Sequence, residues 1–171
     1  MERFIFLDFD GVLNTGRYQR ELQARGETLR DALGPRFDPQ AVDALRMLLE
    51  RSGARLVITS SWRTAGLAAM RHLWRSRSLP GEVTDITPFY MFSAYRTSPQ
   101  EEPFMGFTPG CRGLEIAEWL TRHAEPDASY VILDDEEDFL LQQASRLVHI
   151  NPETGLTPAD ARKAGYKNSS K

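Results

Sequence analysis

Short runs of consecutive apolar residues recur along the chain, and most of them end in polar residues. The first run begins at Phe4, and the others lie within 54–62, 129–135 and 146–150. Runs of this length that are rich in β-branched and large apolar residues are typical of strands buried on both faces of a sheet. The pattern therefore predicts four strands in a buried sheet.

Helical periodicity fills the intervals between these runs. Asp38 followed by Pro39 is typical of a helix N-cap and first turn, and Gly53 is typical of a helix end. Between them the apolar residues repeat at the spacing of an amphipathic helix. The other helical segments are 64–77 and 112–123, with 17–33 expected to be helical or looped.

Strands that alternate with helices indicate right-handed crossovers and a mainly parallel sheet with helices on both faces. We therefore predict an α/β fold with three Rossmann-like layers and a single domain over 1–166, followed by a disordered tail at 167–171. Residues 81–110 carry prolines and aromatic residues without a clear period, so an irregular insertion is expected there, forming a wall or rim of a site.

Composition places the chain among soluble globular proteins. Its 171 residues suit one domain, and 41% of them are hydrophobic against 26% charged. No run approaches the roughly 20 apolar residues of a membrane helix. The core pattern starts at Phe4, which leaves no room for a signal peptide, so we expect a cytoplasmic protein without a membrane partner. The single cysteine, Cys111, is expected to be a packing residue.

The net charge of −3 combines an arginine-rich first half with an acidic second half. A basic half can bind phosphates or nucleic acid, but arginines scattered among acids are usually solvated surface residues. We therefore expect no strong binding of long nucleic acids.

Carboxylates follow two of the predicted strands. Asp8 and Asp10 end the first strand and Asp134 and Asp135 end the third, while the hydroxyl residues 59–61 end the second. Because parallel strands place their carboxyl ends at one edge, these side chains are expected to gather there. Crowded carboxylates need protons or a cation, and an oxygen ligand set favours Mg²⁺. An Asp-Gly turn or an acidic loop on its own is a common structural feature without a functional role. Their joint position at the ends of separate strands favours a functional site.

These residues resemble the haloacid dehalogenase (HAD) superfamily of phosphatases, whose four motifs match in order over nearly the whole chain. DFDGVL from Asp8 matches the first motif, Thr59 with Ser60 the second, and Arg112 the third, with Arg63 as a rival cation. Asp134 and Asp135 match the fourth, with Asp138 in reserve. Val12 and Arg112 stand where threonine and lysine are more frequent. The stretches DFDGVLN, ITSSWR, RGLEIAEWL, YVILDDEEDF and NPETGLT are similar to small bacterial HAD domains that also occur in multidomain RNA-repair proteins.

The resemblance implies a Mg²⁺-dependent phosphomonoester hydrolase. Asp8 would attack phosphorus to form an aspartyl-phosphate, and Asp10 would act as general acid and base. The implied phosphate ligands are Thr59, Ser60 and Arg112, and the implied metal ligands are Asp8, Asp10 through its backbone carbonyl, Asp134 and Asp135.

The expected partner is a phosphorylated small molecule or a nucleic-acid end. The short stretch between Asp10 and the strand that ends at Thr59 leaves room for only a minimal cap, so the site is expected to be open. An open site suits the end of a polymer, with aromatic residues available for stacking on a base: Phe89, Tyr90, Phe92 and Tyr95. The alternative is a phosphate-binding or RNA-end-binding module, or a partner-docking subunit, with the same fold and little turnover. The acid at Asp10 favours hydrolysis.

Overall fold

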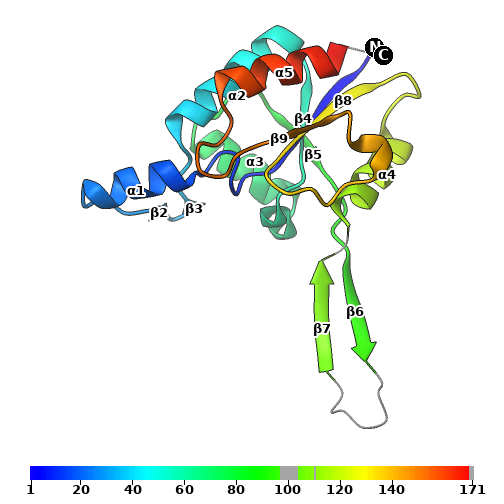
Figure 1. Cartoon of the computed structure of the whole chain (residues 1–171), viewed down its shortest axis with the longest axis horizontal. Helices are drawn as coiled ribbons and strands as arrows, with labels where there is room; N and C mark the ends of the chain where they lie inside the picture. The colour runs from blue at the N-terminus through cyan, green and yellow to red at the C-terminus, as the bar shows by residue number, and fades with distance from the viewer. Residues whose placement is uncertain (97–103, 110, 170–171) are drawn as a thin grey trace.

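The computed structural model describes residues 1–96, 104–109 and 111–169 of the chain. Within these residues, one sheet holds five strands in the order β5-β4-β1-β8-β9, and all neighbours pair in parallel (Figure 1). Its strands are β1 (Arg3–Leu7), β4 (Arg55–Ile58), β5 (Val83–Ile86), β8 (Ser129–Asp134) and β9 (Leu147–His149). The predicted α/β class with a parallel sheet is confirmed.

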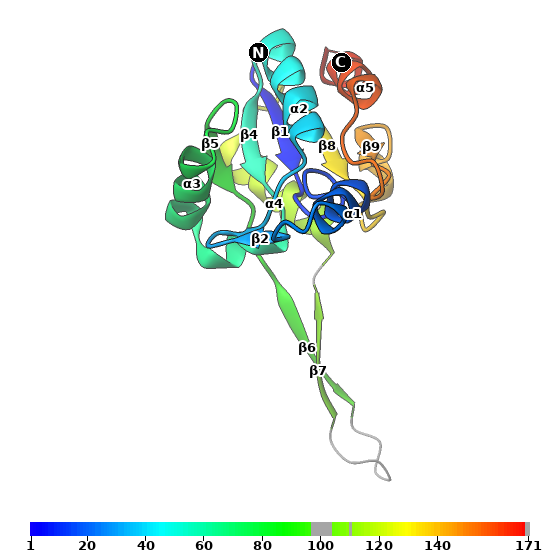
Figure 2. The same ribbon diagram turned by 90° about the vertical axis from the view of Figure 1, so that its left-hand side faces the viewer.

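Helices cover both faces of this sheet and give the predicted three layers (Figure 2). One face packs against α2 (Pro39–Ser52), α3 (Leu67–Ser76) and α5 (Pro158–Ser169), and the other packs against α4 (Arg112–His123). Strand β1 shows why its apolar run is continuous: Ile5 and Leu7 belong to the first core, whereas Phe4 and Phe6 contact the α4 side. Both faces of the strand are buried, so alternation is absent.

The helix that follows Asp38 begins and ends as its sequence predicts. The Asp38 carboxylate accepts a hydrogen bond from the Gln40 N–H at 2.9 Å, and Pro39 is the first helical residue. Gly53 ends α2 in the left-handed region at φ 60°. These local signals set the first and last residues of the helix that connects β1 to β4.

Residues 17–33 form a helix and part of a small hairpin. Helix α1 spans Gly16–Ala24, and β2 (Arg30–Asp31) pairs antiparallel with β3 (Gly34–Pro35). We call residues 30–35 the flap. The flap and α1 are the only elements that the structure places between β1 and α2 within this fully described stretch, which agrees with the predicted minimal cap.

The prediction of an irregular insertion at 81–110 is wrong for the described part of that segment. Strand β5 joins the sheet as an edge strand, and β6 (Met91–Arg96) pairs antiparallel with β7 (Phe104–Pro109) in a hairpin that projects away from the sheet (Figure 1). Only Val83 of β5 is buried, because an edge strand lacks a second neighbour, so the apolar period is weak. For Phe92 and Tyr95 the structure describes the backbone only, so their predicted role in base stacking lies outside the described side chains.

Two further boundaries differ from the sequence prediction. The helix predicted at 64–77 is divided into a 3-10 turn, η1 (Ser61–Ala65), and α3, with Gly66 between them at φ 91°. Helix α5 continues to Ser169 and so includes most of the tail that was expected to be disordered.

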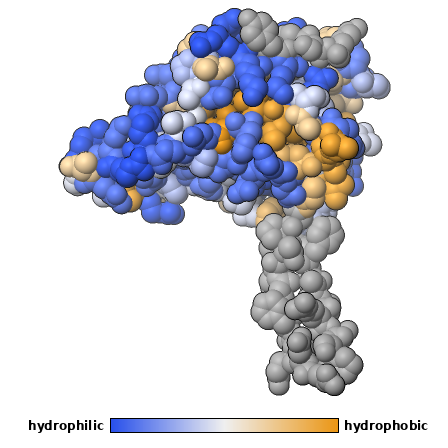
Figure 3. Space-filling model, viewed as in Figure 1, coloured by the Kyte–Doolittle hydropathy of each residue, from blue (hydrophilic) through white to orange (hydrophobic). Residues whose placement is uncertain are grey.

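Polar residues cover most of the molecular face shown in Figure 3, and apolar surface gathers above the base of the hairpin. The exposed large apolar residues include Leu114, at 50%, and Leu141, at 91%. In the part of the chain that the structure describes, no helix is both long and apolar enough to cross a membrane.

Candidate active site

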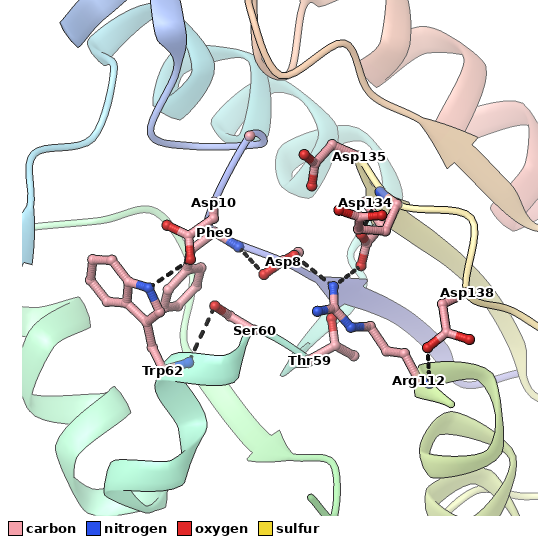
Figure 4. Close-up of polar contacts among 12 residues, drawn as sticks. Asp8, Phe9, Asp10, Thr59, Ser60, Trp62, Arg112, Asp134, Asp135 and Asp138 are labelled. Atoms are coloured by element: carbon pink, nitrogen blue, oxygen red, sulfur yellow. Dashed lines mark hydrogen bonds and ion pairs between the residues drawn. The ribbon is translucent and has the colours of Figure 1, made fainter. Parts of the chain in front are cut away.

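Three adjacent strands deliver their polar ends to one edge of the sheet. Asp8 follows β1, Thr59 follows β4 and Asp134 ends β8, and all three residues are at most 4% exposed (Figure 4). Because β1 lies between β4 and β8, its end is the centre of this group. The predicted gathering of these residues at the carboxyl edge is therefore present.

Asp8, Asp134 and Asp135 form a carboxylate cluster. One carboxylate oxygen from each residue lies within 4.8 Å of the other two. Arg112 reaches the cluster from α4: its Nη1 donates to Asp8 Oδ2 at 2.6 Å and to Asp134 Oδ2 at 2.5 Å. One guanidinium thus binds two of the three carboxylates in the cluster.

The pKa values in this cluster show the excess of negative charge. Burial, followed by the nearby charge of Asp8, raises the pKa of Asp134 to about 7, and the same two causes raise the pKa of Asp135. Burial alone would lower the pKa of Arg112, but Asp8 and Asp134 raise it above the ordinary value. A divalent cation fits this donor set, because hard oxygen ligands and uncompensated negative charge are what Mg²⁺ requires.

Without a metal ion, Asp134 should make stability depend on pH. Its pKa is about 7 in the folded chain against an ordinary 3.8. Between these values the folded chain holds a proton that the unfolded chain has lost, so raising the pH favours unfolding. In a chelating buffer, the free energy of unfolding of Asp134→Asn relative to wild type should therefore increase as the pH rises through this window. Urea unfolding at several pH values measures this difference, and a difference that is constant with pH would contradict the assignment.

Helix α4 begins at Arg112 because the loop after β8 holds its first turn. The Arg112 N–H donates to Asp138 Oδ2 at 3.1 Å, and the Gly113 N–H donates to the Asp138 carbonyl at 3.0 Å. A Cβ at Gly113 would lie 2.6 Å from the Leu140 nitrogen, so only glycine fits this approach. Asp138, the reserve metal ligand, therefore caps α4 in this structure.

Arg63, the rival cation, is bound elsewhere. It is 3% exposed, forms a buried ion pair with Glu115 and donates from Nε to the Thr87 carbonyl at 3.1 Å. It also donates to the carbonyls of Thr59 and Pro88. Burial lowers the pKa of Arg63 and raises that of Glu115. Arg63 thus joins the ends of β4 and β5 to α4 beneath the site.

Thr59 and Ser60 lie directly after β4, and the Thr59 N–H and the Ser60 hydroxyl are each hydrogen-bonded. The Thr59 N–H donates to the Leu7 carbonyl at 2.9 Å and extends the sheet. The buried Thr59 hydroxyl, however, has no hydrogen-bond partner among the described residues. The Ser60 hydroxyl accepts from the Trp62 N–H at 3.4 Å and caps η1.

Asp10 points away from the carboxylate cluster, and its side chain is exposed (Figure 4). Its Oδ1 accepts from Asn14 Nδ2 at 2.6 Å, and its Oδ2 accepts from Trp62 Nε1 at 2.9 Å. Its expected backbone contribution to a metal site stays a prediction. Asn14 and Trp62 both lie inside motif stretches, but neither residue type is specific for catalysis, so their contacts with Asp10 could not be predicted from the sequence.

The turn that carries Asp10 is held by the loop at 151–156. The Leu156 N–H donates to the Val12 carbonyl at 2.9 Å, and the Gly16 N–H donates to the Pro152 carbonyl at 3.0 Å. Gly11 adopts φ 70°, and a Cβ there would overlap the Asp135 carboxylate. The NPETGLT stretch therefore supports the first acidic motif from a distant part of the chain.

A family model described as the HAD domain in Swiss Army Knife RNA repair proteins matches residues 4–161. The matched segment begins in β1 and ends in α5, so it includes every residue of the site described above. No curated protein and no solved structure matches the chain.

Proposed function

Because the chain belongs to the family of HAD domains of Swiss Army Knife RNA repair proteins, we propose that it is a Mg²⁺-dependent phosphatase that forms an aspartyl-phosphate on Asp8. The observation that supports this most is the placement of Asp8 beside Arg112, within a cluster of buried carboxylates at the carboxyl edge of the sheet. Asp10 stands two residues further on, where it can serve as a proton donor.

The metal would be held by Asp8, Asp134 and Asp135. When bound, Mg²⁺ supplies positive charge that reduces the repulsion between Asp8 and an anionic ester and stabilises charge on the phosphoryl oxygens. Arg112 adds a permanently charged donor on the same side of Asp8. The Thr59 hydroxyl is a further donor, since it has no partner among the described residues.

The chemistry follows in two steps. An oxygen of Asp8 bonds to phosphorus, the bond from phosphorus to the ester oxygen breaks, and Asp10 gives its proton to the leaving oxygen. Water then bonds to phosphorus while Asp10 takes its proton, and the bond between phosphorus and Asp8 breaks. Phosphate and the starting enzyme result.

Hydrolysis of an aryl phosphate with Mg²⁺ and with excess chelator tests this function. We expect Mg²⁺-dependent turnover, and acid-quenched protein should carry a phosphoryl group on Asp8 that Asp8→Asn lacks. Metal-dependent binding of a phosphorylated oligonucleotide without turnover of any ester would instead favour the binding-module alternative.

Replacement of Arg112 should reduce catalysis, whereas replacement of Arg63 should reduce stability. Arg112→Ala removes a charged donor aimed at the transferring group and should cost about 2–4 kcal/mol of transition-state stabilisation. Arg63→Ala leaves Glu115 buried without its partner and should cost about 3–5 kcal/mol of folding free energy. Steady-state kinetics in saturating Mg²⁺ and urea unfolding separate the two effects. A stable Arg63→Ala variant with the larger catalytic loss would reverse the assignment.

We further propose that the substrate is the phosphorylated end of a nucleotide or oligonucleotide. The family description names RNA repair, and Phe89 and Tyr90 are 36% and 38% exposed. The Tyr90 N–H donates to Glu115 at 2.9 Å, which places this aromatic pair beside the first turns of the helix that carries Arg112.

A substrate panel checks this preference. Oligonucleotides with a 3′- or 5′-phosphate should give a higher kcat/KM than sugar phosphates, and Phe89→Ala should reduce only the former, since stacking is worth about 1–3 kcal/mol per base. Affinity should fall with added salt. A tenfold advantage for a sugar phosphate would contradict the substrate class and leave the phosphatase assignment intact.

A further inference from the structure

Both oxygens of the Asp10 carboxylate are held by side-chain N–H groups. Trp62 Nε1 donates to Oδ2 at 2.9 Å, and Asn14 Nδ2 donates to Oδ1 at 2.6 Å. The Asn14 amide is itself oriented, because its Oδ1 accepts from the Gly11 N–H at 3.1 Å. A carboxylate bound at both oxygens keeps one rotational orientation. Figure 4 shows it turned toward the indole.

The indole of Trp62 is fixed by an aromatic cluster under the flap. Its ring meets the ring of Phe9 edge-on at 5.5 Å between centroids, and it lies 5.8 Å from the ring of Phe37. Phe9 is fully buried and adjoins Asp10 in sequence. The indole therefore rests on the same turn whose carboxylate it binds.

The flap packs against the six-membered ring of this indole. A Cβ built at Gly34 would lie 2.8 Å from Cη2 of Trp62, so the glycine backbone packs directly against the ring. Arg77, whose side chain is 10% exposed, fastens the flap to α3 by donating from Nη2 to Asp31 at 2.7 Å and to the Gly34 carbonyl at 3.1 Å. A continuous series of contacts thus connects the flap to Asp10.

We propose that Trp62 is a positioning residue for Asp10, and that the seating of the flap on the indole sets the orientation of the Asp10 carboxylate. The catalytic part rests on the proposed function, in which Asp10 transfers a proton to the leaving oxygen. Such a group must lie within hydrogen-bond reach of that oxygen. A flap that leaves the indole removes the packing that holds one of the two donors to the acid in place.

Trp62→Phe tests the hydrogen bond, because it keeps an aromatic ring and removes the N–H donor. For an alkyl phosphate, kcat should fall about tenfold, the effect of one hydrogen bond to a charged group. For an aryl phosphate, whose leaving group needs little protonation, kcat should change much less. Asp10→Asn combined with Trp62→Phe should be no slower than Asp10→Asn alone. Equal losses for both esters, or additive losses in the double variant, would overturn the proposal.

Gly34→Ala tests the flap, with Gly26→Ala as the matched control. Both glycines have positive φ, 118° and 67°, but a Cβ at Gly26 has nothing within 4 Å. The readout is the NMR signal of the Trp62 indole N–H, assigned by its loss in Trp62→Phe. Asp10→Asn and Gly34→Ala should each shift this signal, whereas Gly26→Ala should not. Unchanged signals in the first two variants would disprove the coupling.

The spectroscopic experiment needs no substrate and no metal. If the wild-type protein hydrolyses no ester in Mg²⁺, the proposed function fails, while the indole signals still decide whether the flap and Asp10 are coupled. If hydrolysis occurs and the signals do not respond, the coupling alone is wrong.

Discussion

Replacing Asp8 by asparagine should reduce Mg²⁺-dependent hydrolysis by about 10⁴-fold or more, as expected for loss of a covalent nucleophile. An amide is a poor nucleophile, and it also removes one of the three charges that would hold the metal. Initial rates over a range of substrate and Mg²⁺ concentrations measure the loss. A near wild-type rate would exclude the aspartyl-phosphate mechanism.

Folding should survive this substitution. The new side chain keeps an oxygen that can accept the Phe9 N–H, which now donates to Asp8 at 2.7 Å, and the cluster loses one repelling charge. Urea unfolding should therefore show no loss of stability. Glu136→Gln is the matched control, because it neutralises an exposed carboxylate two residues beyond Asp134 and should leave the rate unchanged.

Asp10→Asn should slow hydrolysis by about 10²–10⁴-fold for esters with poor leaving groups, because both proton transfers lose their donor or acceptor. The loss should be smaller for an aryl phosphate. Comparing kcat for an alkyl and an aryl ester in wild type and variant measures the difference. Equal losses would argue against a general acid.

Metal binding distinguishes Asp10→Asn from Asp8→Asn. The Asp10 carboxylate lies outside the cluster formed by Asp8, Asp134 and Asp135, so its replacement leaves those three charges in place. The Mg²⁺ concentration that gives half-maximal rate should therefore stay near that of wild type. A large increase in that concentration would assign the Asp10 side chain to the metal site instead.

The sequence was sufficient to predict the edge of the sheet at which these residues meet. Strand β1 is buried on both faces, so its apolar run stands out, and Asp8 follows directly. The rule that parallel strands align their carboxyl ends then brings Asp8, Thr59 and Asp134 together. Strand β5 was missed because its position at the sheet edge leaves only Val83 buried.

The roles of the two arginines could not be separated from sequence. Arg63 follows the end of a predicted strand and Arg112 begins a predicted helix, and charge alone does not distinguish them. What separates them is Glu115, one turn after Arg112, which pairs with Arg63. The contact between Trp62 and Asp10 was equally inaccessible, because it depends on how the flap packs across the aromatic cluster.

The central position of β1 also determines when the carboxyl edge of the sheet is assembled during folding. Phe6 pairs with Val57 on one side and with Ile132 on the other, so the strand needs two partners that are distant along the chain. Contacts of such long sequence separation form late and slowly. In a chain on which β8 has not yet docked, Asp8 follows a strand with one unpaired, strongly apolar edge, which can pair with another chain. The docking of β8 therefore both assembles the carboxylate cluster and protects the chain from aggregation.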